Sequence, residues 1–383
     1  MVKDEWRFKE NSEVHAAASL TMRNILESLM GNIDEVWTGK PMIHLGHGDP
    51  LVYPCFRTSP IVEDALVEAI RSAKFNCYAA GAGINPARRA VANYLSRDIP
   101  YKLTTDDVFL TVGAEHAIHV LLTVLACPGA NILFPKPNYP TYEARARFSS
   151  LEVRHFDLIP EKGWEVLVEA QEVDLDGVKA LADNKTVAIV LINPGNPCGS
   201  VFTFDHMQKI AETARELGIL VIADEVYAHQ VFGEKSFIPM GIVNSLKSCL
   251  LITAEPPTVI QGAVPRILES TPESFFLNIN NLLKEAADMF YERLKEIPLL
   301  ACPHKPEGSM FVLVKLNLSG FEDVVDDIDF CMMLAKEESM ILLPGEAVGL
   351  KNWIRVSFAA EQKVLEDAIG RMKVFCLRHA KYY

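Results

Sequence analysis

The stretch that decides the fold is VAIVLINPGNPCG (187–199), together with ILVIADEVY (219–227) further along the chain. Each apolar run ends in polar residues, Asn196 after the first and Asp224 after the second. The spacing of residues 204–218 predicts a helix between them, with Asp205 as its N-cap and Gly218 as its stop. A strand–helix–strand unit of this kind binds ligands at the carboxyl ends of its strands. An amide and a carboxylate there suit a flat polar heterocycle, the amide at a ring oxygen and the carboxylate at a ring nitrogen.

The composition narrows the class of protein. The chain has 383 residues, which predicts two domains, and its 49% hydrophobic and 23% charged residues are typical of a globular protein. A net charge of −13 argues against nucleic acid as a partner. No apolar run reaches membrane-spanning length, and the charged first residues do not resemble a signal peptide. The eight cysteines form no CxxC pair, so we expect no metal site, reduced thiols and a cytoplasmic location.

The other segments alternate between strand and helix patterns in the middle of the chain. DVFLTVG (107–113) is predicted to be a buried strand that leads into a helix. Strands are also expected at 131–135 and 153–158, which implies a mostly parallel sheet. The two ends of the chain, with strand patterns at 310–316 and 353–359, are expected to form a second, smaller domain.

Three further positions have side chains or backbone suited to binding. The turn at 113–115 can offer backbone N–H groups to an anion at a helix N-terminus, although any strand–helix turn can hold a glycine. Tyr139 lies in the proline-rich PKPNYPTY (135–142), where stacking on a planar ligand and ordinary loop packing are equally compatible with the sequence. Arg355 lies inside an apolar strand and needs a partner such as a carboxylate, from the substrate or from the protein.

Taken together, these segments resemble the pyridoxal-phosphate-dependent aminotransferases of fold type I (class I/II), and most closely the plant tyrosine and nicotianamine aminotransferases. The resemblance covers nearly the whole chain. It is carried by GHGDP, FNCYAAGAG, FPKPNYPTYEARA, NPGNPCGSV, VIADEVYAH, TVIQGAVPRILE, CPHKPEGSMFV and NWIRVSFA.

The resemblance implies a role for each site residue. Gly113, Ala114 and Glu115 would hold the cofactor phosphate through main-chain N–H groups, and Tyr78 would reach the phosphate of a neighbouring subunit in a homodimer. Tyr139 would stack on the ring, Asn196 and Tyr227 would bond its hydroxyl, and Asp224 would keep its nitrogen protonated. Gly48 and Arg355 would hold the substrate carboxylate.

The resemblance also implies the domain boundaries. They are an N-terminal arm over 1–30, a small α+β domain from 31–71 and 288–383, and a large cofactor-binding domain over 72–287. The large domain would have helices on both faces of its sheet.

The chain departs from this pattern after Gly241. The family has a strand there, followed by a Ser-x-Ser-Lys segment, an arginine and a second strand. Between Tyr227 and Pro272 the only lysines are Lys235 and Lys247, neither in the family context. We therefore expect no Schiff-base lysine, no phosphate-binding arginine and a large-domain sheet that lacks two strands. Residues 167–173 resemble an insertion.

The sequence thus predicts an aminotransferase-family protein of amino acid metabolism that is inactive or impaired in this form. The family reaction transfers an amino group from a tyrosine-like amino acid to a 2-oxo acid. Pyridoxal phosphate would bind weakly and without a covalent bond. Two alternatives stay open: a C–S lyase of the same family, and a non-catalytic partner that dimerises with an intact paralogue.

Overall fold

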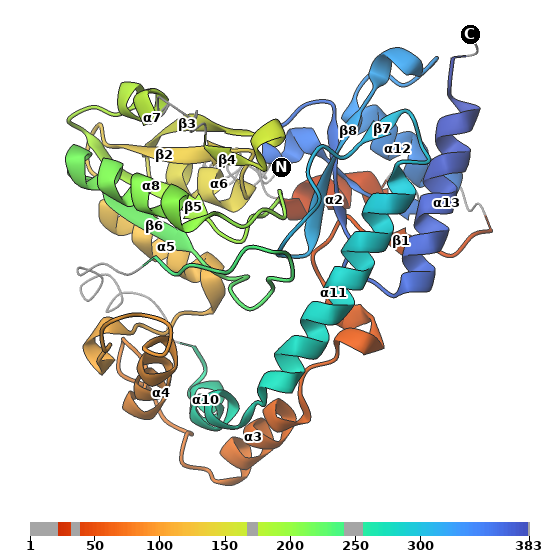
Figure 1. The fold of residues 1–383 in the computed structure, drawn as a ribbon. Helices are drawn as coiled ribbons and strands as arrows, with labels where there is room; N and C mark the ends of the chain where they lie inside the picture. Colours follow the sequence, from red (N-terminus) through yellow and green to blue (C-terminus); the bar gives the residue numbers. More distant parts are fainter. Residues whose placement is uncertain (1–21, 32–38, 167–174, 241–255, 382–383) are drawn as a thin grey trace, which may run out of the picture.

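The computed structural model describes residues 22–31, 39–166, 175–240 and 256–381 (Figure 1). The predicted insertion at 167–173 and the segment of 241–255, where two strands are expected to be missing, lie outside the described residues. No helix in the described part of the chain is both long and apolar enough to cross a membrane.

The larger sheet has the strand order β4-β3-β2-β5-β6, and its strands are parallel except for the short β4. Side chains alternate across it, so that Ile132 and Phe134 of β2 face one helical layer and Leu133 faces the other. The strands are β2 (Asn131–Lys136), β3 (Glu152–Ile159), β4 (Glu165–Val166), β5 (Thr186–Ile192) and β6 (Leu220–Asp224).

Helices cover both faces of this sheet (Figure 1). Apolar residues of α5 (Gly113–Leu125) and α6 (Pro140–Phe148) cluster with one face, and those of α7 (Leu175–Leu181) and α8 (Phe204–Leu217) cluster with the other. The predicted mostly parallel α/β sheet is confirmed.

The N-cap of helix α8 lies two residues earlier than the sequence indicates. Its N-cap is Thr203, whose hydroxyl accepts a hydrogen bond from the His206 N–H at 3.3 Å. The predicted cap, Asp205, instead lies in the first turn, where its charge suits the helix dipole. Gly218 ends the helix with a φ of 67°, as predicted.

The second sheet is antiparallel, with the order β10-β11-β8-β7, and a small parallel pair, β1 with β9, lies apart from it. The apolar side chains of the antiparallel sheet share one continuous core with the long helix α11 and with the face of the large sheet that α7 and α8 cover. The elements are β1 (Ile43–His44), β7 (Leu300–Ala301), β8 (Phe311–Leu316), β9 (Met340–Ile341), β10 (Leu343–Pro344), β11 (Trp353–Ser357), α2 (Met22–Gly31), α11 (Glu273–Leu294), α12 (Asp327–Glu338) and α13 (Gln362–Arg378).

Three further helices lie together at the end of α11, away from both sheets (Figure 1). They are α3 (Pro60–Arg71), α4 (Asn85–Leu95) and α10 (Thr258–Ser270). Two of them, α3 and α10, pack through small side chains, Ala65 and Ala69 against Ala263. The domain boundaries proposed from the sequence stay a prediction.

The predicted strand at 107–113 is wrong. Residues 108–112 run without strand or helix structure into α5. The Leu110 N–H donates to the Ala82 carbonyl at 3.0 Å, and the Val108 carbonyl accepts from Arg88 Nε at 3.0 Å. These backbone groups therefore bond to a loop and to a side chain instead of to a neighbouring strand, and a strand needs such a neighbour.

Candidate active site

The carboxyl ends of β5 and β6 meet at one edge of the large sheet. Ile192 is in register with Asp224, and the Asn193 N–H donates to the Asp224 carbonyl at 3.0 Å. Asn196 follows three residues later, so the two predicted polar side chains are brought to the same edge, as the strand–helix–strand pattern requires.

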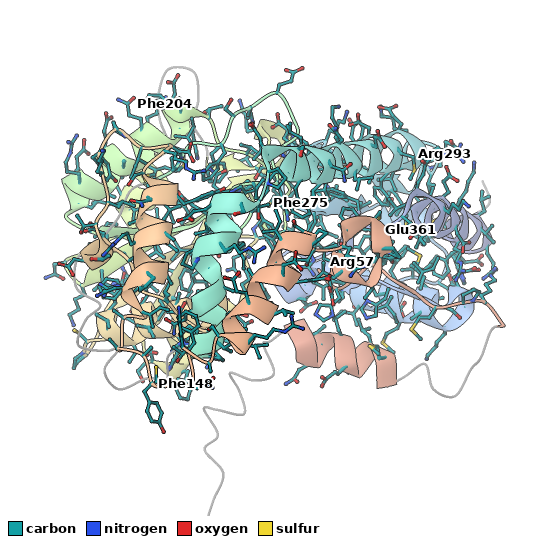
Figure 2. All side chains as sticks on the ribbon, turned by 90° about the horizontal axis from the view of Figure 1, so that it is seen from below. Arg57, Phe148, Phe204, Phe275, Arg293 and Glu361 are labelled. Carbon is teal, nitrogen blue, oxygen red and sulfur yellow. The ribbon has the colours of Figure 1, made fainter. Side chains whose placement is uncertain are left out.

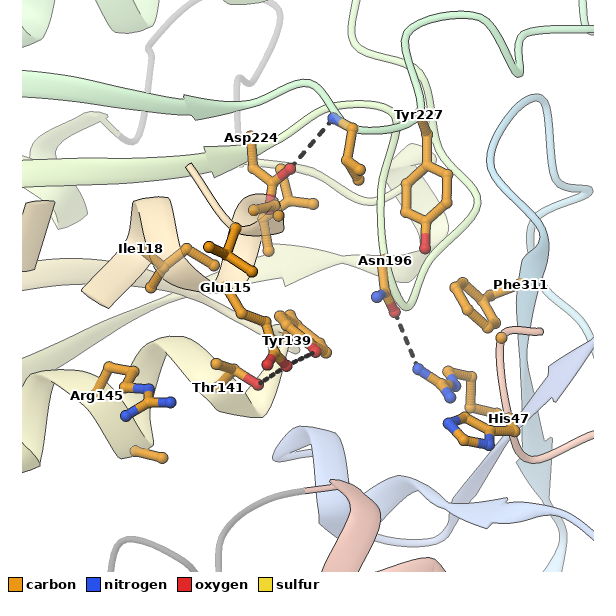
Figure 3. Close-up of a pocket in the computed structure, with 18 of the residues that line it drawn as sticks. His47, Glu115, Ile118, Tyr139, Thr141, Arg145, Asn196, Asp224, Tyr227 and Phe311 are labelled. Atoms are coloured by element: carbon orange, nitrogen blue, oxygen red, sulfur yellow. Dashed lines mark hydrogen bonds between the residues drawn. The ribbon is translucent and has the colours of Figure 1, made fainter. Parts of the chain in front are cut away.

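A cavity of about 670 Å³ opens at this edge (Figure 3). It collects every predicted cofactor and substrate residue except Tyr78. Its lining residues are His47, Gly48, Val112, Gly113, Ala114, Glu115, Ile118, Tyr139, Thr141, Ala144, Arg145, Phe148, Ile192, Asn196, Asp224, Val226, Tyr227, Phe311 and Arg355. Phe148, which lines this cavity, lies at the surface of the molecule and is exposed (Figure 2).

Asp224 is held in place by two donors. Its Oδ2 accepts from the Tyr142 hydroxyl at 3.0 Å, and its Oδ1 accepts from the Val226 N–H at 3.2 Å. Burial raises the pKa of Asp224, and these two hydrogen bonds oppose that rise. A carboxylate with a fixed direction and a raised proton affinity is suited to share a proton with a heterocyclic nitrogen.

Glu115 organises the end of the cavity at the start of α5. Its Oε1 accepts from the Tyr139 hydroxyl at 2.7 Å and from the Thr141 hydroxyl at 3.4 Å. Burial, together with the Glu115 carboxylate, raises the pKa of Tyr139 to about 12. Tyr139 therefore stays a neutral phenol whose ring is fixed in the cavity wall.

Arg355 lies at the opposite end and is fully buried. Its Nη1 donates to Asn196 Oδ1 at 3.1 Å and its Nη2 donates to the Gly46 carbonyl at 2.7 Å. The guanidinium carbon lies 4.1 Å from the centre of the Phe311 ring, which is a cation–π contact. Burial lowers the pKa of Arg355 to about 10, and charged Tyr227 or Tyr139 would raise it. An incoming carboxylate would supply the negative charge that these neutral partners do not.

Two glycines shape the cavity wall. A Cβ on Gly48 would lie 2.5 Å from Phe311 Cζ, so a side chain there would displace the ring under Arg355. Gly113 has a φ of +75°, a conformation that favours glycine, and begins α5. Both glycines that the sequence singled out are required by local geometry.

Several residues of the cavity were missed by sequence reasoning. They are His47, Thr141, Arg145 and Phe311, and Tyr142, which binds Asp224 from outside the lining, was missed as well. A signal for Thr141 and Tyr142 was present, because Pro140 at the start of α6 places the next residues in its first turn, beside Tyr139. Tyr78 is fully exposed and does not line this cavity, so its predicted role across a subunit interface stays a prediction.

No lysine is found among the described residues that line the cavity. Lys235, the described candidate, forms an ion pair with Glu307 at 3.0 Å and is not part of the lining. Lys247 lies outside the described residues. The described residues also contain no group of three or more histidine, cysteine, aspartate or glutamate side chains that could hold a metal ion.

A parallel sheet with an amide and a carboxylate at neighbouring strand ends, facing a buried arginine, is the arrangement that the resemblance predicts. The chain matches the model of the family "Aminotransferase class I and II" over residues 40–260 and again over 240–372. This chain belongs to that family.

Curated relatives and solved structures agree with this assignment. The chain is 47% identical to nicotianamine aminotransferase 1 of Oryza sativa subsp. japonica over 422 residues, which covers 98% of this chain and 84% of that protein. It is 45% identical to the S-alkyl-thiohydroximate lyase SUR1 of Arabidopsis thaliana, over 98% of this chain and 88% of the relative. The tyrosine aminotransferase of Leishmania infantum superposes with a TM-score of 0.86 at 29% identity, covering 99% and 100% of the two chains.

Pyridoxal phosphate is the cofactor expected of this family, and the cavity fits its ring. Asp224 suits the ring nitrogen, Asn196 and Tyr227 suit the ring oxygen, and Tyr139 offers an aromatic face. The described lining contains no lysine that could anchor the ring covalently, and Lys247 lies outside the described residues.

Proposed function

We propose that this chain binds pyridoxal phosphate and an amino or 2-oxo acid in the cavity without covalent attachment, and is impaired as an aminotransferase. The observation that carries this proposal is the cavity itself. It joins Asp224, Asn196 and Arg355 in one space and has no lysine among its described lining residues. The amino acid of the intact family reaction would be aromatic or tyrosine-like.

The cofactor ring and the substrate carboxylate would bind at opposite ends of the cavity. When bound, the cofactor ring supplies an electron sink for charge developing at the amino acid Cα. Asp224 would hold the proton on the ring nitrogen, since burial raises its own pKa and Tyr142 fixes its direction. Arg355 would orient the substrate carboxylate, and Phe311 supports the guanidinium from below.

A missing lysine removes the group that would move the proton at Cα. A positioned base contributes roughly 10²–10⁴-fold to such a step. Support for a lost segment comes from the family match, which is in two parts that overlap at 240–260. The alignment with the rice relative also runs over 422 residues, although this chain has 383, so it contains gaps.

The open edge of β6 supports the same proposal. In the described part of the chain, β6 pairs with β5 alone, and its first residue, Leu220, is 36% exposed. Apolar parallel strands are normally buried between neighbours. A strand of sequence LVIAD at an edge is what the loss of two adjacent strands would leave.

A C–S lyase is the second candidate. The relative SUR1, which is named as an S-alkyl-thiohydroximate lyase, is nearly as similar to this chain as the rice aminotransferase is. The two activities differ in product, so amino-group transfer to a 2-oxo acid and release of a thiol from a cysteine conjugate distinguish them.

We further propose that the protein is a cytoplasmic homodimer, in which Tyr78 contributes to the partner's site. The exposure of Tyr78 supports the second point, because the side chain is available to another subunit. The described cysteines are free thiols, which suits a reducing compartment. Sedimentation velocity measures the oligomeric state.

The test of the proposed function is a titration of pyridoxal phosphate followed by intrinsic fluorescence, with transamination of tyrosine assayed in parallel. We expect saturable binding that dialysis reverses, and no detectable amino transfer. Asp224→Asn keeps the shape of the side chain and is expected to weaken binding. Turnover comparable to that of an intact relative would contradict the proposal, and so would a complete lack of binding.

A further inference from the structure

A carboxylate lies where the proposed ligand would place a phosphate. Glu115 is in the first turn of α5, and its side chain faces the cavity together with Tyr139 and Thr141 (Figure 3). The dipole of α5 stabilises a negative charge at this end of the helix. The protein therefore brings its own anion to the turn at 113–115.

This carboxylate also uses the hydroxyl donors of the turn. The Tyr139 hydroxyl lies 2.7 Å from Glu115 Oε1 and the Thr141 hydroxyl lies 3.4 Å from the same atom. A phosphate dianion bound to the backbone N–H groups of this turn would meet a like charge at close range. It would also have to compete with Glu115 for two hydroxyl donors.

We propose that Glu115 lowers the affinity of this cavity for the phosphorylated form of its pyridine ligand, relative to the form with a neutral hydroxymethyl arm. The inference rests on the proposed function, because it takes the pyridine ring to bind at Asp224 and Asn196. It concerns whether the arm of the ligand carries a phosphate, and the contacts to the ring do not determine this. Glu115 is thus a specificity-determining residue at the end of the cavity opposite Arg355.

Arg145 is the nearby charge that acts in the opposite direction. It lines the same cavity one turn beyond Thr141 on α6, and its guanidinium makes no hydrogen bond or ion pair with the described residues. Burial, and after it the charge of Arg145, lowers the pKa of His119 on α5, so the field of Arg145 reaches the neighbouring helix. Arg145 gives a second variant, with an expected effect of opposite sign.

The test compares two ligands that differ only in the arm, pyridoxamine and pyridoxamine 5′-phosphate. Neither has an aldehyde, so binding is free of covalent chemistry. Calorimetry of the full chain measures both dissociation constants for the wild type and for Glu115→Gln, which removes the charge and keeps an oxygen acceptor for Tyr139. Glu161→Gln, on an exposed turn outside the cavity, is the control for net charge.

We expect Glu115→Gln to bind pyridoxamine 5′-phosphate about ten-fold more tightly, which is ~1.4 kcal/mol, and to bind pyridoxamine unchanged. Arg145→Met should weaken binding of the phosphate form only. An equal change for both ligands would overturn the inference, since Glu115 would then act through Tyr139. Unchanged or weaker binding of the phosphate form by Glu115→Gln would overturn it too. Failure of the wild type to bind either ligand would instead reject the proposed function.

Discussion

Replacement of Arg355 by methionine is expected to abolish most of the affinity of this protein for an aromatic 2-oxo acid such as phenylpyruvate. Methionine fills a similar volume above Phe311 but has no donor for a carboxylate. The guanidinium lies at 4.1 Å from the Phe311 ring and is held by Asn196 and Gly46, so it needs little further ordering when a ligand binds.

The size of the effect follows from the hydrogen bonds at stake. A charge-assisted hydrogen bond is worth ~1.5–3 kcal/mol, and a carboxylate bound in a bidentate manner makes two. We therefore expect a loss of ~3–6 kcal/mol, or about 10²–10⁴-fold in dissociation constant. Arg355→Lys keeps a point charge without the planar guanidinium, so its affinity should lie between those of the wild type and Arg355→Met.

Removal of the guanidinium also affects stability. The Gly46 carbonyl and Asn196 Oδ1 lose a donor, which costs ~1–3 kcal/mol for each buried acceptor. Relief from burying a cation opposes this cost, so the variant is expected to be folded but less stable. Urea unfolding of the variant is measured first, so that loss of affinity is not confused with loss of fold.

The assay is calorimetric titration with phenylpyruvate at several pH values. Burial lowers the pKa of Arg355 to about 10, so wild-type affinity should be constant between pH 7 and 9 and fall as the pH rises through that value. The control is Arg57→Met, because Arg57 is exposed and pairs with Glu63 outside the cavity. If Arg355→Met bound phenylpyruvate as tightly as Arg57→Met, the assignment of Arg355 to the carboxylate would be wrong.

Two further predictions concern the dependence of stability on pH. Burial raises the pKa of Glu225 to about 7, although a hydrogen bond from the Met240 N–H at 2.6 Å opposes the rise. Glu225 therefore favours the folded state below pH 4.5 and loses that contribution as the pH rises to 7. At pH 8, Glu225→Gln should be more stable than the wild type by ~1–3 kcal/mol, and an equal free energy of unfolding for the two proteins would contradict this prediction. His379 contacts Asp323 and Glu337 and has a raised pKa, so its contribution to stability is present below pH 6.5 and is lost above its folded pKa. In chemical denaturation, His379→Gln should be less stable than the wild type at pH 6 but differ little from it at pH 9. A loss of stability that is the same at both pH values would count against an ionic role.

Residues at strand ends could be predicted from the sequence because their position follows from local pattern alone. The apolar runs before Asn196 and Asp224, and the amphipathic stretch between them, fix a parallel pair with both side chains at one edge. Arg355 could be predicted because an arginine in a buried strand must have a polar role, and the structure places it at the cavity wall.

Features that depend on a distant partner could not be predicted in this way. The segment 107–113 has a run of apolar residues, which indicates burial. Such a run does not indicate whether a neighbouring strand is present to accept hydrogen bonds. The contact of Tyr142 with Asp224 joins residues 82 positions apart. The competition between Glu115 and a ligand anion for Tyr139 becomes visible only when both side chains are placed in one cavity.

The most direct test of the account is reduction of the protein with borohydride after incubation with pyridoxal phosphate, followed by peptide mass spectrometry. The ring-binding residues are present in the cavity, and the lysine of the family is expected to be missing. We therefore predict that cofactor binds but leaves no stoichiometric phosphopyridoxyl adduct on any lysine. A stoichiometric adduct on one residue, such as Lys247 or Lys235, would contradict the account and would identify a relocated anchor.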